Sequence, residues 1–395
     1  MKIASFIILL SLLFSQSHSQ TLLSHLSEQD TLSGKSLFET VSGIEKKTDY
    51  FNLSILMQGG FNTNFRGDEF EQAAFKMKEF RIDARGKVTP WLSYRWRQRL
   101  NRGNTPAELD NLPLSIDYAM VDVRFSDRLS FKIGKQAAAY GGFEYDLDPH
   151  EIYQYSDMID YMYFDFMTGL TGIYQLNANQ QFQIQIVNSR CSSMEELYGI
   201  LPEGMEKSKL PLAYTLNWNG YFFGNRLATR WSFSLLNQAR NTCIFYYVIG
   251  NQLNINKLNI YLDFTLSDEE LDSREIISDI IRSEENPTCA EYTRYQSWVT
   301  KLNYRFRPHW NLFVKGMYET ASIYKQTRNR EKGKYRTSYG YFGGIEFYPM
   351  KENFRFYLAY LGRSYRYTDR ANQYGTKDYS TTQLSLGLIY NLPLF

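Results

Sequence analysis

Hydrophobic and polar residues alternate along most of the chain, from about residue 51 onward. In the segment 181–186, Phe182, Ile184 and Ile186 alternate with glutamines. Residues 257–266 repeat the pattern with Leu, Ile and Phe on one face and polar side chains on the other. A period of two residues is typical of a β-strand whose two faces meet different surroundings. The pattern therefore predicts a chain built of β-strands.

About sixteen such segments follow one another. They start near residues 51, 73, 92, 114, 129, 168, 180, 211, 226, 242, 257, 293, 311, 337, 353 and 379. The connections alternate between short ones, such as 125–128, and long ones, such as 62–72, 139–167 and 268–292, with 238–241 as a short exception. An even number of strands with alternately short and long connections is typical of an outer-membrane barrel. We therefore expect an all-β fold, a transmembrane antiparallel β-barrel over residues 51–395.

Composition agrees with a barrel and excludes other classes. The chain is 43% hydrophobic and 16% aromatic, yet its mean hydropathy is −0.44. Membrane helices need runs of about 18 or more apolar residues, and none follows the first twenty positions. The 44 Lys and Arg nearly balance the 42 Asp and Glu, so no basic field for nucleic acid is expected. A polar inner wall explains the low hydropathy, whereas a soluble β-sandwich, the alternative, rarely needs this many strands.

Aromatic residues near the predicted strand ends are expected to form girdles at the two membrane interfaces. These residues are Trp91, Trp96, Trp218, Trp231, Trp310, Tyr304, Tyr348 and Tyr390.

The first nineteen residues have the order of a secretory signal peptide. Lys2 precedes an apolar run, and Ser17 and Ser19 provide the small residues of a cleavage site before Gln20. The alternative is a retained anchor, but the apolar run is short for one. We expect residues 1–19 to be removed, residues 20–50 to form a periplasmic segment, and the protein to lie in the outer membrane.

Several motifs resemble the phosphate-selective porin O and P family. They are Phe80-Arg-Ile-Asp-Ala-Arg-Gly86, Ile116-Asp-Tyr-Ala-Met-Val-Asp122, Gly134-Lys-Gln136 and Tyr140-Gly-Gly-Phe-Glu144. The resemblance implies a sixteen-stranded barrel, assembled as a homotrimer, whose third outer loop folds into the lumen. Outer-membrane barrels as a group also commonly end in Phe, as Phe395 does here. The chain departs from the family at Ala139-Tyr140-Gly141, where the family has Pro-Phe-Gly, so phosphate is not carried over as the solute.

Five arginines on two neighbouring predicted strands are expected to line the pore. Arginine at the lipid midplane costs about 2–4 kcal/mol, which favours an inward orientation. The expected pore-lining residues are Arg81, Arg85, Arg95, Arg97 and Arg99, with Glu79 and Asp83 on the same face.

The third long connection, 139–167, is acidic and contains no Lys or Arg. Its expected constriction residues are Glu144, Asp146, Asp148, Glu151, Asp157 and Asp160, with Tyr153 and Tyr155 among its aromatic rings. An acidic loop opposite an arginine wall would produce a transverse field that orients polar solutes. The alternative is that the arginines pair within the wall, with Glu79, Asp83 and Asp117. The rings either pack the loop against the wall or stack on sugars.

The connection 268–292 is also rich in Asp and Glu. We expect a solvated surface loop with a short helix near 278–281, and divalent-cation binding is the alternative. Of the three cysteines, Cys243 and Cys289 lie on neighbouring loops and are the expected disulfide, which leaves Cys191 as a thiol.

These features favour a porin that allows passive diffusion of small polar solutes and ions. The alternatives are a facilitated channel for an anion such as phosphate or for an oligosaccharide, and a structural or adhesive barrel. An enzyme is not expected, because His150 is the only histidine on a pore loop and no serine lies in a nucleophile elbow. No cofactor or metal is expected, and the expected partners are outer-membrane lipid and lipopolysaccharide.

Overall fold

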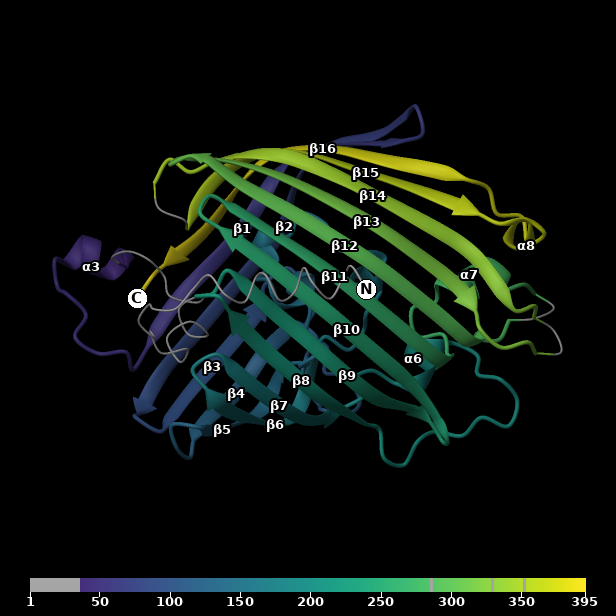
Figure 1. Cartoon of the computed structure of the whole chain (residues 1–395), viewed down its shortest axis with the longest axis horizontal. Coiled ribbons are helices and arrows are strands. Elements are labelled where there is room, and N and C mark those ends of the chain that lie inside the picture. Colours follow the sequence, from purple (N-terminus) through teal and green to yellow (C-terminus); the bar gives the residue numbers. More distant parts are fainter. Residues whose placement is uncertain (1–35, 285–286, 328–329, 351–352) are drawn as a thin grey trace, which may run out of the picture.

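The chain forms a closed antiparallel barrel in which each strand pairs with its neighbours in sequence and β1 pairs with β16 (Figure 1). The structure is a computed structural model that describes residues 36–284, 287–327, 330–350 and 353–395. The predicted signal peptide and residues 20–35 lie outside the described residues. No helix in the described ranges is long and apolar enough to cross a membrane.

The barrel strands are β1 (Asn52–Arg66), β2 (Glu69–Thr89), β3 (Leu92–Arg99), β4 (Ile116–Arg124), β5 (Leu129–Ala137), β6 (Phe166–Asn177), β7 (Gln180–Asn188), β8 (Leu212–Phe222), β9 (Leu227–Ala239), β10 (Thr242–Ile255), β11 (Leu258–Leu271), β12 (Glu291–Arg307), β13 (Trp310–Ile323), β14 (Gly333–Phe347), β15 (Phe354–Tyr367) and β16 (Tyr379–Pro393). The short helices are α3 (Leu37–Ser42), α4 (Phe143–Asp146), η1 (Pro149–Glu151), α5 (Asp157–Asp160), α6 (Met194–Tyr198), α7 (Ile276–Ile281) and α8 (Asp369–Asn372).

The predicted all-β class and strand number are confirmed, and the strand starts expected from the sequence lie within a few residues of those observed. One expected loop is wrong. Residues 62–72 are not a long connection, because β1 and β2 continue to a tight turn at Gly67 and Asp68. Gly67 has φ +58, a backbone conformation that glycine adopts without steric cost.

Side chains alternate between the two faces of the wall. On β16, Leu384, Leu386 and Leu388 are exposed on the outer face, whereas Ser385 and Ile389 point inward and are buried. The outer face is apolar over most strands, and the inner face carries most of the buried Lys, Arg, Asp and Glu. This is the arrangement expected of a barrel in lipid, where the outward residues contact acyl chains and the inward residues contact water or one another.

The two ends of the barrel differ. At one end the connections are short turns, and α3 and the C-terminal residue lie there (Figure 1). At the other end lie α6, α7 and α8, together with the long connections between β3 and β4, β5 and β6, β7 and β8, and β11 and β12. We call these the short-turn end and the long-loop end.

The expected aromatic girdles need one correction. Trp96, Trp231 and Tyr304 are exposed on the outer face, and Trp91 is exposed in the turn before β3. Tyr348, however, is buried inside the barrel, where its hydroxyl donates to Glu346 (2.9 Å) and its ring lies 4.0 Å from the Arg305 guanidinium. Tyr348 lies two positions after the inward residue Glu346, so the alternation of β14 continues past the strand end and directs the Tyr348 side chain inward.

We expect Leu386→Arg to reduce the free energy of unfolding by about 2–4 kcal/mol, because it places a cation at the middle of the lipid-facing surface. Thr382→Arg is the matched control, since it lies on the same face of β16 nearer the strand end and should cost at most about 1 kcal/mol. Urea-induced unfolding in lipid vesicles measures both values. Equal losses for the two variants would contradict the assigned lipid-facing surface.

Candidate functional site

The connection between β5 and β6, residues 138–165, extends to the opposite side of the barrel interior. The Tyr153 hydroxyl donates to Glu346 on β14 (2.7 Å), and the amides of Asp157 and Met158 donate to Glu319 on β13 (2.9 and 3.0 Å). Glu319 and Glu346 are buried on the inner face of their strands. The β5–β6 connection therefore lies against the inner surface of the wall opposite its own strands.

Carbonyl oxygens 150–155 of the β5–β6 connection each accept a hydrogen bond from a Lys or Arg side chain of the wall. The donors are Arg355 to His150, Lys301 to Glu151 (2.7 Å), Lys78 to Ile152 (3.0 Å) and to Tyr153, Lys315 to Gln154 (2.7 Å), and Arg363 to Tyr155 (2.5 Å). A charged donor makes a stronger hydrogen bond than a neutral one. These contacts fix an irregular backbone that would otherwise leave buried carbonyl groups unpaired.

Two acidic side chains of the connection form ion pairs with Lys and Arg side chains of the barrel wall. Glu144, 2% exposed, pairs with Lys315 at 2.5 Å and accepts from Ser156. Asp157, also 2% exposed, pairs with Arg363 and with Arg336 (2.5 Å). The expectation that these two carboxylates face the arginines of β2 and β3 is therefore corrected. Buried carboxylates require close cationic partners, and the inward cations of β13 to β15 provide them.

The connection begins with a close approach of two backbones. Gly141 and Gly142 have φ +73 and +81, and a Cβ on Gly250 of β10 would lie 2.9 Å from the Cα of Gly142. The Glu144 amide then donates to Asp263 of β11 (2.7 Å), which holds the start of α4. Tyr140, where the family has Phe, is fully buried. This turn directs the chain into the barrel instead of away from it.

The five arginines of β2 and β3, which we call the arginine wall, all border internal cavities. Asp117 of β4 is fully buried and pairs with three of them. Its distances are 2.6 Å to Arg81, 2.9 Å to Arg97 and 2.8 Å to Arg99. Arg95 pairs with Asp83 (2.7 Å), and Arg81 also pairs with Glu79 (2.7 Å). Pairing within the wall, the simpler of the two hypotheses, thus accounts for most of this charge.

Two ion pairs nevertheless join the arginine wall to the connection. Arg97 lies 3.7 Å from Asp148, and Arg99 lies 3.5 Å from Asp165. Burial alone would raise the pKa of Asp148, but His150 at 3.0 Å, Arg97 and Arg95 outweigh it and hold that pKa well below its usual range. Asp148 is therefore an anion over the whole physiological pH range, and it lies directly opposite the wall.

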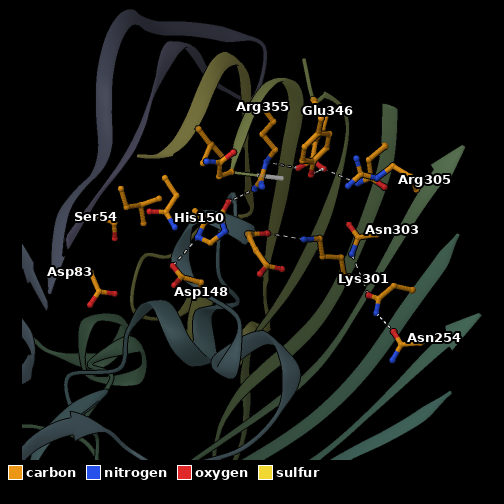
Figure 2. A pocket seen from close by; sticks show the side chains of 18 of the residues that line it. Ser54, Asp83, Asp148, His150, Asn254, Lys301, Asn303, Arg305, Glu346 and Arg355 are labelled. Atoms are coloured by element: carbon orange, nitrogen blue, oxygen red, sulfur yellow. Dashed lines mark hydrogen bonds and ion pairs between the residues drawn. The ribbon is translucent and has the colours of Figure 1, made fainter. Parts of the chain in front are cut away.

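Two cavities meet at these residues. One, of about 440 Å³, opens among the strand ends of the short-turn end (Figure 2). The other, of about 610 Å³, extends between the connection and strands β2 to β9. Both are lined by Arg81, Arg97, Asp148 and Glu151. The two cavities thus border one another at this group of charged side chains.

Of the remaining expected constriction residues, some line the larger cavity and one is buried between the connection and the wall. Asp146, which pairs with Arg230 (3.3 Å), Asp160 and Tyr155 line the larger cavity. Tyr153 does not: its ring stacks on Phe313 at 4.7 Å and is buried. The Tyr153 ring therefore packs the loop against the wall, which was one of the two expected roles, whereas Tyr155 borders the larger cavity.

The expected solvated loop at 268–292 is wrong. β11 continues to Leu271, and α7 is buried through Ile276, Ile277, Ile280 and Ile281. Arg274 is fully buried and donates to the Met158 carbonyl of the β5–β6 connection (3.2 Å). The short helix was expected. Because one face of α7 is apolar, the segment is buried in the barrel mouth, where it packs against the β5–β6 connection.

The expected Cys243–Cys289 disulfide is absent, and all three cysteines are free. Cys243 has the outward orientation of its neighbour Phe245 on β10, whereas Cys289 is buried inside, 3.7 Å from the Ser278 hydroxyl. The two thiols therefore lie on opposite sides of the wall. Within the described residues, no group of three or more His, Cys, Asp or Glu side chains is placed to hold a metal ion.

A profile of the family "Phosphate-selective porin O and P" matches residues 51–392. The chain belongs to this family. No curated protein sequence matches it. Among solved structures, it is similar to the outer-membrane channel DcaP of Acinetobacter baumannii (10% identity, TM-score 0.62, 91% of this chain and 100% of that one covered). It is also similar to the anion-selective porin from Comamonas acidovorans (8%, 0.56, 87% and 99%). A third is a trimer form of OmpT of Vibrio cholerae (12%, 0.51, 87% and 100%). These likenesses establish the porin fold.

Sequence reasoning missed the cations that hold this porin's β5–β6 connection. They are Lys78, Lys301, Lys315, Arg336, Arg355 and Arg363. The strand alternation identifies Lys301 as inward-facing, because it shares a face with Ser297 and Val299. It does not identify which loop atom each cation contacts.

We expect Asp117→Asn to lower the free energy of unfolding by about 3–5 kcal/mol, because three buried guanidinium groups lose their shared carboxylate. Asp127→Asn, in an exposed turn, is the control and should have no effect. Denaturant unfolding in detergent compares the variants. Unchanged stability of the Asp117 variant would show that the arginines do not depend on this carboxylate.

Lys315→Met should remove both the partner of Glu144 and the donor to Gln154. The freed connection is then expected to fluctuate, so the single-channel current should switch between sublevels where the parent gives one steady level. Lys334→Met is the control, since the Lys334 side chain is exposed. A steady current through the Lys315 variant would argue against fixation by this contact.

Proposed function

We propose that this porin allows passive diffusion of small polar solutes and ions across the outer membrane. The observation that carries the proposal is the pair of polar cavities that meet at Arg81, Arg97, Asp148 and Glu151. Arginine and carboxylate on opposite sides of this point give a transverse field, which orients dipolar solutes and hinders apolar ones. The family and the fold are those of channels rather than of enzymes.

The charges of the passage favour one second candidate, a channel with a preference for anions. Lys and Arg outnumber Asp and Glu among the residues that line each cavity. Much of this positive charge already has partners within the protein, however. Asp117 pairs with three arginines, and Lys301 and Arg355 donate to loop carbonyls. The proposal therefore remains general diffusion, with a modest anion preference as its alternative form.

The topology and the assembly are part of the proposal. Outer-membrane barrels place short turns in the periplasm and long loops outside, so the short-turn end is assigned to the periplasm. Residues 1–19 serve as the signal peptide, and residues 20–50 form a segment on the periplasmic side of the membrane. A homotrimer in contact with lipid and lipopolysaccharide is supported by the family and by the similar OmpT structure, which is described as a trimer.

Single-channel recording in a planar bilayer under a KCl gradient tests the function. We expect stepwise openings, a small reversal potential, and no block by added phosphate or maltose. Strong anion preference with phosphate block would establish the anion-selective alternative. Openings blocked by the sugar would indicate an oligosaccharide channel, and no openings at all would favour a structural barrel.

Asp148→Asn should move the reversal potential toward anions, because it removes the carboxylate that faces Arg97. Asp68→Asn, which removes an exposed charge at the β1–β2 turn, should leave the reversal potential unchanged. Recordings at low salt give the largest difference, since screening is weakest there. Identical selectivity of the Asp148 variant and the parent would place the solute path elsewhere.

A further inference from the structure

The segment that precedes the barrel is ordered against its short-turn end and lies outside the stretch matched by the family profile, residues 51–392. It contains α3, which begins after a capping box between Ser36 and Glu39. The Phe38 amide donates to the Leu394 carbonyl (3.0 Å). The Phe38 ring lies 4.9 Å from the Phe395 ring. Helix α3 and the last residues of the chain thus pack together (Figure 1).

This contact lies at the edge of the lipid-facing surface. The Phe395 ring also lies 5.7 Å from that of Phe51. Phe51 precedes β1 with the same alternation as the outward residues Ile55 and Phe61. The Lys87 amide donates to the Asp49 carbonyl (2.8 Å), so the far end of the segment is fixed to β2. The segment therefore follows the rim of the barrel where the apolar outer surface ends.

One face of the segment is apolar and uncovered. Leu37 and Val41 lie one turn apart on α3, Ile44 follows directly after the helix ends at Gly43, and the three side chains are 45%, 80% and 61% exposed. We call them the apolar stripe. The polar side chains of the segment are instead engaged, since Glu39 accepts from the Lys46 backbone amide (2.9 Å) and the Lys46 ammonium donates to Asn52 (2.8 Å). A fixed helix that exposes its apolar side chains needs a partner that can cover them.

We propose that the apolar stripe is an interfacial anchor that inserts into the phospholipid leaflet at the short-turn end of the barrel. Phe38 of the same helix joins the ring cluster of Phe395 and Phe51 at the edge of the apolar outer surface, which brings the stripe next to the lipid that surrounds the barrel. Short amphipathic helices bind membranes by this kind of shallow insertion. A second protein copy fits less well, because stable interfaces bury roughly 1,200–2,000 Å², far more than three side chains provide.

Site-directed spin labelling of the full protein in phosphatidylethanolamine–phosphatidylglycerol vesicles tests the anchor. All three native cysteines are first replaced, and single labels are placed by Val41→Cys, by Thr48→Cys and by Leu386→Cys. Thr48 is the matched control, because it is an exposed polar residue of the same segment. Leu386 is the lipid-facing reference on β16. Each label is compared for collisions with oxygen, which dissolves in lipid, and with a water-soluble nickel chelate.

We expect the Val41 label to resemble the Leu386 label, with a several-fold higher ratio of oxygen to nickel collisions than the Thr48 label. Ile44→Cys is a second probe of the same stripe and should agree with Val41. A Val41 label as accessible to nickel as the Thr48 label would overturn the anchor. A label shielded from both reagents would also overturn it, because the stripe would then be covered by protein, either a second copy or another part of the chain.

Discussion

The interior of this porin depends on charged side chains that satisfy the backbone of an inward-folded loop. Residues 150–155 have no strand or long helix to pair their carbonyl groups, and lysines and arginines from β2, β12, β13 and β15 donate to each of them. An unpaired buried carbonyl is costly, so the loop keeps its path only while these donors are in place. Two of these cations, Lys315 and Arg363, also pair with Glu144 and Asp157, so they fix both the backbone and the charge of the loop.

This arrangement makes the passage asymmetric. The loop and α7 occupy the space beside β11 to β15, where the buried aromatic and aliphatic side chains gather. The remaining space borders the arginine wall and strands β4 to β9. Solutes would therefore move along one side of the barrel, past arginines whose charge Asp117 has largely balanced. The resulting selectivity depends on the few charges that remain opposed across the gap, Asp148 above all.

Sequence alternation was sufficient for the wall but not for its contents. It predicted the strand number and the inward direction of residues such as Arg81 and Arg97, because a barrel strand has only two faces. It could not give the partners of Glu144 and Asp157, because these lie more than 150 positions away along the chain. The buried Arg274 and the separation of Cys243 from Cys289 were missed for a related reason. An acidic loop that also contains apolar residues cannot be told from a solvated loop by its sequence. The position of a cysteine on a neighbouring loop likewise does not show whether its thiol points inside or outside the barrel.

Hydrogen–deuterium exchange of the protein in lipid vesicles tests the fixed loop most directly. The amides of Glu144, Ser156, Asp157 and Met158 all donate to buried carboxylates. Peptides that cover 143–158 should therefore exchange nearly as slowly as those of the flanking strands β5 and β6. Exchange as fast as that of the exposed turn at 125–128 would contradict a fixed loop, and with it the account of the passage given above.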